Sequence, residues 1–448
     1  MFTIPKDSVL SAEIIKDAIA YNELKRNDYD KFEDYYLGEH DIKYRTKNSI
    51  YKNNKIVVNH AKYITDINTG YLLGNPVDYR AGDFDIGAVK DEYKRQTISD
   101  LDHEIAKDLS IFGRQYELVY TDGNEVKSKD IDVRNAVCIY DDTVQHNKLF
   151  GIIYRVKGGT KFSENTAKFD EIVAYDDSEM YECSRGGEIV VGEGTPHSFG
   201  KVPLIEYRNN SETQGDFQQV ISLIDAYNIL QSDRVNDKEQ LVEAILVGYG
   251  IKMTPEQLEN LRANRTLFVN TPKSEAQFEF LVKNLDESQV DILRQTIQED
   301  IHKISMTPNM SDQEFANNSS GVALRFKLLA FEQSVSNKER YFEKGLLERF
   351  ELYNNYLVSL SKMGIVPKYE VDAVFKRNLP QNVLELSQII NNLAPFVDDE
   401  TLVGELPFVD NAEETVKKNR KEEQDKMKSE IKQYGSFNLT KEEDDRDN

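Results

Sequence analysis

The sequence predicts an α+β fold that is organised around long helices. Apolar residues recur at steps of three and four over residues 286–306 and again over 321–360, which is the period of an α-helix with one buried face. Between residues 114 and 208 the apolar residues instead alternate at every second position, which predicts antiparallel strands. Thr307-Pro308 separates the two helical stretches, because proline disfavours the helical conformation of the residue before it.

Charge and composition narrow the class of protein. The chain has 448 residues, which is enough for about three domains. Lys and Arg total 56 against 79 Asp and Glu, giving a formal net charge of −23. Tight binding of DNA depends on cations that neutralise phosphates, so we expect no tight, sequence-independent binding of nucleic acid.

Targeting and redox signals are sparse. The two cysteines, Cys138 and Cys183, fit no metal or redox spacing, which indicates a reducing compartment. The first residues, MFTIPKDSV, lack a basic start followed by an apolar core, and the longest apolar runs are far shorter than the roughly 20 residues of a membrane helix. We therefore expect no signal peptide, no membrane partner and synthesis in the cytoplasm.

The N-terminal half begins with helices and continues with strands. Helices are predicted over residues 8–37, over 56–71 before the Gly74-Asn75-Pro76 stop, and over about 88–112. Asp122-Gly123 predicts a tight hairpin, and short strands continue to residue 208. We interpret residues 1–214 as an antiparallel β-rich domain built onto the N-terminal helices.

The C-terminal half is mostly helical. A helix over 215–247 leads into a small module over 248–285, in which Thr254-Pro255 opens a short helix and RTLFVNT and QFEFLVK form two strands. The further segments, in order, are a helix over 286–306, a polar loop over 307–320, a long helix and its return over 321–377, helices over 378–435 and an acidic, disordered tail over 436–448.

No catalytic motif is present in the sequence. It contains no phosphate-binding loop and no GxSxG, HExxH or GxGxxG pattern. The six histidines are scattered without metal-ligand spacing, and Asp141-Asp142 and Asp176-Asp177 are interpreted as loop turns. We therefore expect a protein that is not an enzyme and that has no cofactor and no metal site.

Acidic side chains gather on the two helices that flank the small module. They are Asp225, Asp233, Asp237, Glu239, Glu243, Asp286, Glu287, Asp291, Glu299 and Asp300. An ordinary solvated face and a functional wall are both open interpretations of this pattern. The candidates for a functional wall are Asp233, Asp237, Glu243, Asp286, Asp291 and Glu299.

These segments together resemble the portal proteins of tailed bacteriophages, specifically the SPP1-type siphovirus portal family. The stretches that carry the resemblance follow the order of the family and are VVNHAKYITDINTGYLLGNPV (57–77), KVPLIEYRNN (201–210), GDFQQVISLIDAYNILQSD (215–233), NSSGVALRFKLLAFEQSVSNKERYFEKGL (318–346) and LPQNVLELSQIINNLAPFVDDETLVGELPFV (379–409). Portals of this family form a ring, dodecameric in the virion, at one capsid vertex, through which DNA is packaged and later ejected.

The resemblance implies a portal-like fold with long stem and wing helices, an antiparallel β-rich wing domain, a small α/β clip and a helical crown. On this interpretation residues 1–214 and 321–377 are the wing, 215–247 and 286–306 are stem helices, 248–285 is the clip, 307–320 is the tunnel loop and 378–435 is the crown. The tunnel-loop residues expected to meet DNA are Met310, Ser311, Asp312, Gln313, Glu314, Phe315, Asn317 and Asn318.

The resemblance also implies partners and a location. They are a homo-oligomeric ring, double-stranded DNA that passes through without sequence-specific contacts, the terminase large subunit, head-tail adaptor proteins, and the major capsid and scaffold proteins. The protein would reside at the portal vertex of the virion after assembly in the host bacterial cytoplasm. Acidic stem helices that face the channel would repel phosphates at short range, which would explain a DNA-handling protein with so negative a charge.

Two rival classes stay open. A metal-dependent nuclease would show an activity that one Asp substitution abolishes. A phage scaffold or adaptor without a channel would form elongated particles that lack a central hole.

Overall fold

The structure is a computed structural model that describes residues 1–47, 52–155, 171–185, 188–242, 245–249, 254–256, 259, 277–281, 287–310, 328–377, 383–404, 406, 409, 412, 415–422 and 426. The chain divides into two compact units, one of residues 1–312 and 327–378 and the other of 313–326 and 379–448. Helices and strands are mixed, in agreement with the predicted α+β class.

Single capping residues mark the ends of the N-terminal helices. Helix α1 (Ala12–Glu23) starts at Ser11, whose side chain accepts the Ile14 amide, and α2 (Arg26–Leu37) ends at Gly38 in the left-handed conformation. Helix α3 (His60–Leu73) begins at Asn59, whose side chain accepts the Lys62 amide at 2.9 Å. The predicted start at Ile56 was therefore wrong, because residues 56–59 are not helical.

The single helix predicted over 88–112 was wrong. The structure has α4 (Gly87–Arg95) and α5 (Ile98–Phe112), separated at Thr97, whose φ of 50° is left-handed. Val89 and Tyr93 on α4 and Ile105 and Leu109 on α5 are all buried. Each helix therefore keeps its own buried face, and the apolar pattern appeared continuous across the break.

The larger sheet has six strands in the order β1-β5-β6-β7-β8-β11. Their bounds are β1 Phe2–Ile4, β5 Ala136–Asp141, β6 Lys148–Arg155, β7 Glu171–Tyr175, β8 Glu179–Glu182 and β11 Gly194–Pro196. A two-stranded hairpin of β9 (Ser184–Arg185) and β10 (Glu188–Ile189) follows β8. The sheet is not wholly antiparallel as predicted, because β1 pairs parallel with β5. The three residues of β1 are too few to show a periodic pattern.

A three-stranded antiparallel sheet lies in the order β12-β3-β4, with bounds β3 Arg114–Asp122, β4 Glu125–Ile131 and β12 Leu204–Arg208. The hairpin predicted at Asp122-Gly123 is confirmed, since Asp122 pairs with Glu125. Gly123 takes a φ of 63°, which the turn requires and which glycine adopts without strain.

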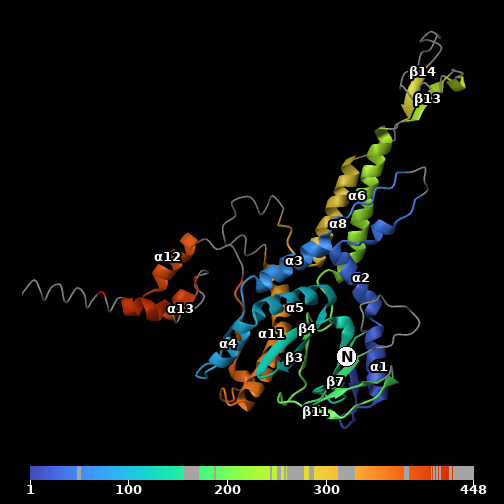
Figure 1. The fold of residues 1–448 in the computed structure, drawn as a ribbon. Helices are drawn as coiled ribbons and strands as arrows, with labels where there is room; N and C mark the ends of the chain where they lie inside the picture. The colour runs from blue at the N-terminus through green and yellow to red at the C-terminus, as the bar shows by residue number, and fades with distance from the viewer. Residues whose placement is uncertain are drawn as a thin grey trace, which may run out of the picture. The chain divides into compact units, whose positions relative to one another are not determined.

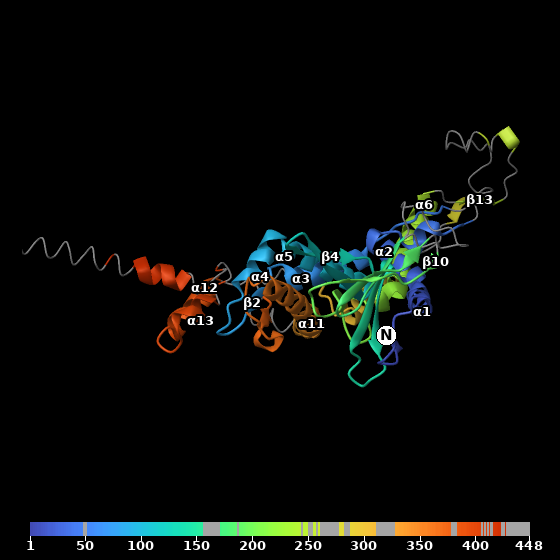
Figure 2. The ribbon, with the colours of Figure 1, turned by 60° about the horizontal axis from the view of Figure 1, so that its bottom comes forward.

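Helix α11 (Leu329–Ser359) packs on β12 and lies along α3 and α4 (Figure 2). The predicted apolar face of the long helix is confirmed within the described residues. The buried members of this face are Leu328, Phe331, Val335, Phe342, Leu346, Phe350, Tyr353 and Leu357. The chain then returns through the 3-10 helix η4 (Lys368–Glu370) to β15 (Asp372–Val374), which pairs with β2 (Asp78–Arg80).

A charged group lies at the centre of this packing. The Arg349 side chain is fully buried on α11, and its Nε lies 2.7 Å from Glu117 on β3 while its Nη1 lies 2.5 Å from Asp102 on α5. Tyr207 on β12 donates its hydroxyl to Glu117 at 2.6 Å. Arg349 therefore connects the long helix to α5 and to the three-stranded sheet.

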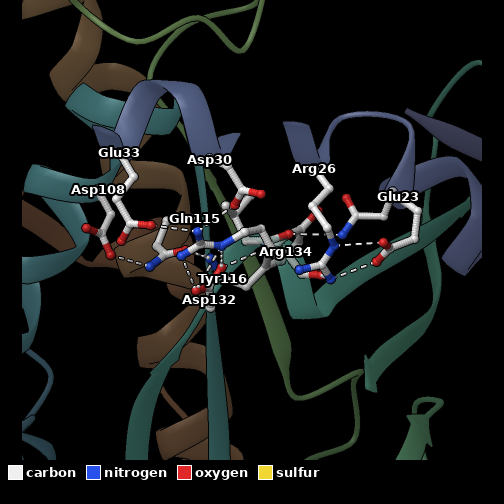
Figure 3. A network of polar contacts seen from close by, with 11 residues as sticks. Glu23, Arg26, Asp30, Glu33, Asp108, Gln115, Tyr116, Asp132 and Arg134 are labelled. Carbon is white, nitrogen blue, oxygen red and sulfur yellow. Dashed lines mark hydrogen bonds and ion pairs between the residues drawn. The ribbon is translucent and has the colours of Figure 1, made fainter. Parts of the chain in front are cut away.

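A second ionic network attaches α2 to the turn before β5 (Figure 3). Arg134, in the 3-10 helix η2 (Val133–Asn135), contacts Asp30 at 2.9 Å and Glu33 at 2.6 Å, both on α2, as well as the neighbouring Asp132 at 2.6 Å. The hydrogen bond between Asp132 and Arg134 raises the pKa of Arg134, so this guanidinium stays charged.

The helix predicted over 215–247 is shorter than expected. A 3-10 turn, η3 (Gln218–Val220), precedes α6 (Ile221–Val242), and Ile245–Tyr249 forms strand β13, which pairs antiparallel with β14 (Gln277–Leu281). The apolar run ILVGY suits a strand or a helix equally by period, and its pairing with β14 decides between them. The predicted strand RTLFVNT lies outside the described residues, whereas QFEFL is confirmed as β14.

The second unit contains α12 (Val383–Leu393), α13 (Asp399–Gly404) and a helical stretch over 415–422. Asp398 begins α13 by accepting the Thr401 amide at 2.9 Å. Across the residues that the structure describes, no helix has both the length and the apolarity needed to cross a bilayer.

Candidate functional site

The candidate site is the helix pair of α6 and α8 (Glu287–Ile304), which lie side by side and lead to the β13–β14 hairpin (Figure 1). At the end near α3, Ile224 and Tyr227 of α6 and Ile301 of α8 are buried in the main core. We call this end of the pair its foot. Apolar packing therefore holds the foot against the rest of the first compact unit, to which both helices belong.

Away from the foot, both helices expose apolar side chains. Ile229 and Val235 on α6 have exposed fractions of 45% and 36%, and Ile292 and Leu293 on α8 have 63% and 50%. Leu293 belongs to the apolar face that the sequence predicts for residues 286–306, and half of its side chain is exposed in the single subunit. We call these four residues the apolar stem face; Ile229 and Val235 project from α6 about 120° apart and Ile292 and Leu293 from α8 about 100° apart, so this surface covers more than one side of the helix pair.

Asp233 on α6 is neutralised within the subunit. Its carboxylate lies 2.9 Å from Arg45 and 2.7 Å from Lys47. Burial alone would raise the pKa of Asp233, but hydrogen bonds from Lys47 and Asn236 outweigh it and lower the pKa. Asp233 therefore adds little net negative charge to the predicted wall.

The other predicted wall residues differ in their ion pairs and in their exposure to solvent. Asp291 on α8 is paired with Arg294 at 2.9 Å and with Arg234 of α6 at 3.5 Å, and its pKa is lowered by the hydrogen bond from Arg294. Glu299 is exposed and Asp237 is partly exposed. Glu243 and Asp286 lie outside the described residues.

An extended segment, residues 54–58, runs along α6 and is held by a ladder of hydrogen bonds. The backbone amides of Asn54, Ile56 and Val58 donate to side-chain oxygens on α6 at 2.8, 2.9 and 2.8 Å. The three acceptors, in the same order, are Asn236, Ser232 and Asn228, and all are buried. Four helical residues rise about 6 Å and two extended residues span about 6.6 Å, so the two periods match. We call residues 54–58 the strap.

The chain that follows α8 is held against α3. The Tyr63 hydroxyl accepts the Met310 amide at 2.8 Å and donates to the Pro308 carbonyl at 3.0 Å. Met310 itself is about half exposed. The remaining predicted loop residues, Ser311, Asp312, Gln313, Glu314, Phe315, Asn317 and Asn318, lie outside the described residues.

Three histidines that are far apart in the sequence gather at the foot. The ring of His60 on α3 lies 5.0 Å from Tyr227 and 5.7 Å from His302, and His302 donates from Nδ1 to the Thr307 carbonyl at 3.0 Å. His40 is also buried, and Asn228 donates to its Nδ1 at 2.8 Å. Burial lowers the pKa of all three imidazoles, and that of His60 falls to about 4. They are therefore packed as neutral rings.

Sequence reasoning missed the strap and the histidine group. The only local signal for the strap is the spacing of Asn228, Ser232 and Asn236 at every fourth position of α6. In the described part of the chain, no group of three or more His, Cys, Asp or Glu side chains is arranged to hold a metal ion.

The helix pair, its exposed face and the chain that returns at its foot belong to a phage portal subunit, as comparison with known families shows. Residues 15–435 match the model of the family described as "Phage portal protein, SPP1 Gp6-like". Because the match extends over nearly the whole chain, the chain belongs to this family.

Two relatives are named portal proteins. The portal protein of Bacillus phage SPP1 is 24% identical over 380 residues, which cover 79% of this chain and 73% of that protein. The portal protein of Clostridium phage phiCD119 is 25% identical over 233 residues, which cover 49% of this chain and 48% of that protein. The resemblance inferred from the sequence is thereby confirmed.

Proposed function

We propose that copies of this subunit close into a ring that surrounds a channel at one capsid vertex, through which double-stranded DNA is packaged and later ejected. Membership of the portal family supports the class of function. The observation that carries the ring is the apolar stem face, which extends over both helices of the pair and is exposed in the single subunit.

Burial of apolar side chains between neighbouring copies would stabilise the ring. Burying a fully exposed Val, Ile or Leu side chain stabilises by about 1.5–3 kcal/mol, so four half-exposed residues supply roughly 3–6 kcal/mol to each contact between neighbours. A contact that joins two different faces of identical subunits repeats by rotation, and it closes into a ring where that rotation returns to the first subunit. Copies of a chain with a net charge of −23 repel one another, so they associate only where the free energy of burying apolar surface exceeds this repulsion.

The parts of the proposed subunit follow from the elements. Helices α6 and α8 would be the stem, and the β13–β14 hairpin would belong to the clip, whose proposed range of 248–285 extends back to Ile245 because the helix ends at Val242. The two sheets with α1–α5 and α11 would be the wing. The helices of 378–435 would be the crown, residues 307–320 the tunnel loop and 436–448 an acidic tail.

The channel wall that we propose is less negative than the sequence alone indicates. Asp237 and Glu299 remain candidates for the surface that repels phosphates, and Glu243 and Asp286 are proposed from their position in the sequence. Asp233 and Asp291 are paired with cations of the same subunit. A wall that is neutralised in part would guide DNA with less repulsion and still form no salt bridges with phosphates.

The tunnel loop is proposed to meet the DNA. Its residues Met310–Phe315 include Asp312 and Glu314 but no Lys or Arg, so the loop can contact a duplex without pairing to phosphates. Replacing both acids by Lys should leave the oligomer intact and reduce packaging, because each cation adds a favourable phosphate contact. Packaging at the wild-type level by procapsids that carry Asp312→Lys and Glu314→Lys would contradict the contact; the isosteric pair Asp312→Asn and Glu314→Gln is the control.

The remaining partners are proposed from the family. The terminase large subunit would supply ATP hydrolysis, head-tail adaptors would bind the ring on its outer side, and major capsid and scaffold proteins would surround it in the virion. The protein itself would be a structural component and not an enzyme, assembled in the host cytoplasm before DNA enters.

The ring proposal is tested on the apolar stem face. The double variant Ile292→Asp and Leu293→Asp should yield smaller oligomers in sedimentation and procapsids that package little DNA, because two carboxylates would be buried between neighbours. The matched control is Val144→Asp, which changes a 99% exposed valine in the turn between β5 and β6. Wild-type rings and packaging from the α8 variant would contradict the assigned interface.

A further inference from the structure

Helix α3 holds the chain on both sides of residues 311–327. On the near side, Tyr63 binds Pro308 and Met310 through its hydroxyl, at 3.0 and 2.8 Å. Asn68, further along the same helix, donates to the hydroxyl of Thr307 at 2.9 Å, and Thr307 is almost fully buried. Three hydrogen bonds, to the Thr307 side chain and to the backbone of Pro308 and Met310, therefore hold the chain where it leaves α8.

On the far side, Tyr71 of α3 contacts the first turn of α11. Its hydroxyl donates to the Glu332 carboxylate, and its ring packs against Phe331 with the ring centroids 4.8 Å apart. Arg377 holds the same carboxylate at 3.0 Å and lies over the Tyr71 ring at 5.8 Å. The start of α11 is thus fixed to α3 by a charge-assisted hydrogen bond, which is stronger than a neutral one.

The two tyrosines lie on one helix at a fixed separation. Tyr63 and Tyr71 are eight residues apart, which corresponds to about 12 Å along an α-helix. One helix therefore contacts the chain on both sides of residues 311–327, at residues 307–310 and at residues 331–332.

Helix α3 is in turn attached to α6. The strap ends at Val58, Asn59 caps α3, and His60 packs between Tyr227 of α6 and His302 of α8. Three buried acceptors and one buried ring thus connect α6 to the start of α3.

We propose that α3 positions the two ends of the chain that flank residues 311–327, with Tyr63 and Tyr71 as the positioning residues, and that the strap couples these ends to α6. The role of the flanked segment at DNA rests on the function proposed above, whereas the anchoring rests on the contacts of α3 alone. When α6 moves, the two ends of the chain that flank residues 311–327 move with it.

The anchoring is tested with phenylalanine variants, which keep the rings and remove only the hydroxyl groups. Hydrogen exchange of the full-length protein is followed by mass spectrometry in peptides that cover 305–310 and 328–334. Tyr63→Phe should accelerate exchange at least about fivefold in the first peptide, because it removes a hydroxyl that makes two hydrogen bonds. Tyr71→Phe should accelerate exchange about fivefold in the second peptide, because it removes the hydrogen bond to Glu332. Tyr181→Phe is the control, because the Tyr181 hydroxyl also makes two hydrogen bonds, at 2.8 and 2.9 Å to Asp176 and Glu179.

The outcomes separate the anchoring from the function. Unchanged exchange in both peptides would overturn the proposal, as would an equal acceleration across the strands of the six-stranded sheet, which would indicate a general loss of stability. Procapsids that carry both Tyr variants should also package less DNA than the Tyr181 control. Local acceleration with packaging at the wild-type level would support the anchoring and contradict the proposed contact of the flanked segment with DNA.

Discussion

Removing the buried charge of Arg349 should destabilise the protein strongly. Arg349 and Glu117 have fully buried side chains and Asp102 has an exposed fraction of 5%, so Arg349→Met leaves two carboxylates in the core without a counter-charge. Losing one partner of a buried ion pair costs about 3–5 kcal/mol. The loss should be larger at pH 8 than at pH 5, because burial raises the pKa of Asp102 already in the wild type and, without Arg349, this carboxyl takes up a proton more readily as the pH falls.

The assay is thermal and urea unfolding of the variant and of two comparison proteins at both pH values. Arg155→Met removes an exposed ion pair with Glu171 and should cost no more than about 1 kcal/mol. The triple variant Arg349→Met, Asp102→Asn and Glu117→Gln should regain part of the loss, since no buried charge remains. The reasoning is refuted if Arg349→Met is as stable as Arg155→Met at pH 8, or if its deficit does not depend on pH.

Further predictions concern packing and titration. Gly345→Ala should lower the free energy of unfolding by about 1–3 kcal/mol, because the new Cβ would lie 2.3 Å from the ring of a buried tyrosine on β12. Gly70→Ala on α3 should raise the free energy of unfolding by about 0.5–1 kcal/mol, since nothing lies within 4 Å of the added Cβ. A thermal midpoint of Gly345→Ala at or above the wild type, or of Gly70→Ala below it, would contradict the respective expectation. Burial, and then the neighbouring His302, lower the pKa of His60 to about 4, below the ordinary 6.5. The contribution of the neutral His60 ring to the free energy of unfolding is therefore complete above pH 6.5 and is lost as the pH falls towards 4. The loss amounts to about 3 kcal/mol, and urea midpoints across this range should fall less steeply for His60→Gln than for the wild type.

The parts of the fold that follow from local patterns were predicted well. The apolar period of the long helix identified its buried residues from Leu328 to Leu357, because a helix that is buried along one side keeps the same spacing over its whole length. The hairpin at Asp122-Gly123 and the end of α2 at Gly38 depend on single residues whose backbone preferences decide the structure.

The parts that depend on distant contacts were not predictable in this way. Strand β1 joins the sheet beside β5, more than a hundred residues away, and its three residues show no period. The two cations that neutralise Asp233, Arg45 and Lys47, lie on a distant segment that reaches α6 only in the folded chain. The charge of a helix face in the sequence therefore overstates the charge that the folded subunit presents.

The central claim is that the subunit closes into a ring with a central channel. Negative-stain images of the purified full-length protein at tens of micromolar, together with its mass in solution, test this most directly. The account predicts round particles with a central hole and a mass that is an integral multiple of 51.6 kDa. A monodisperse monomer, or elongated oligomers without a hole, would contradict it.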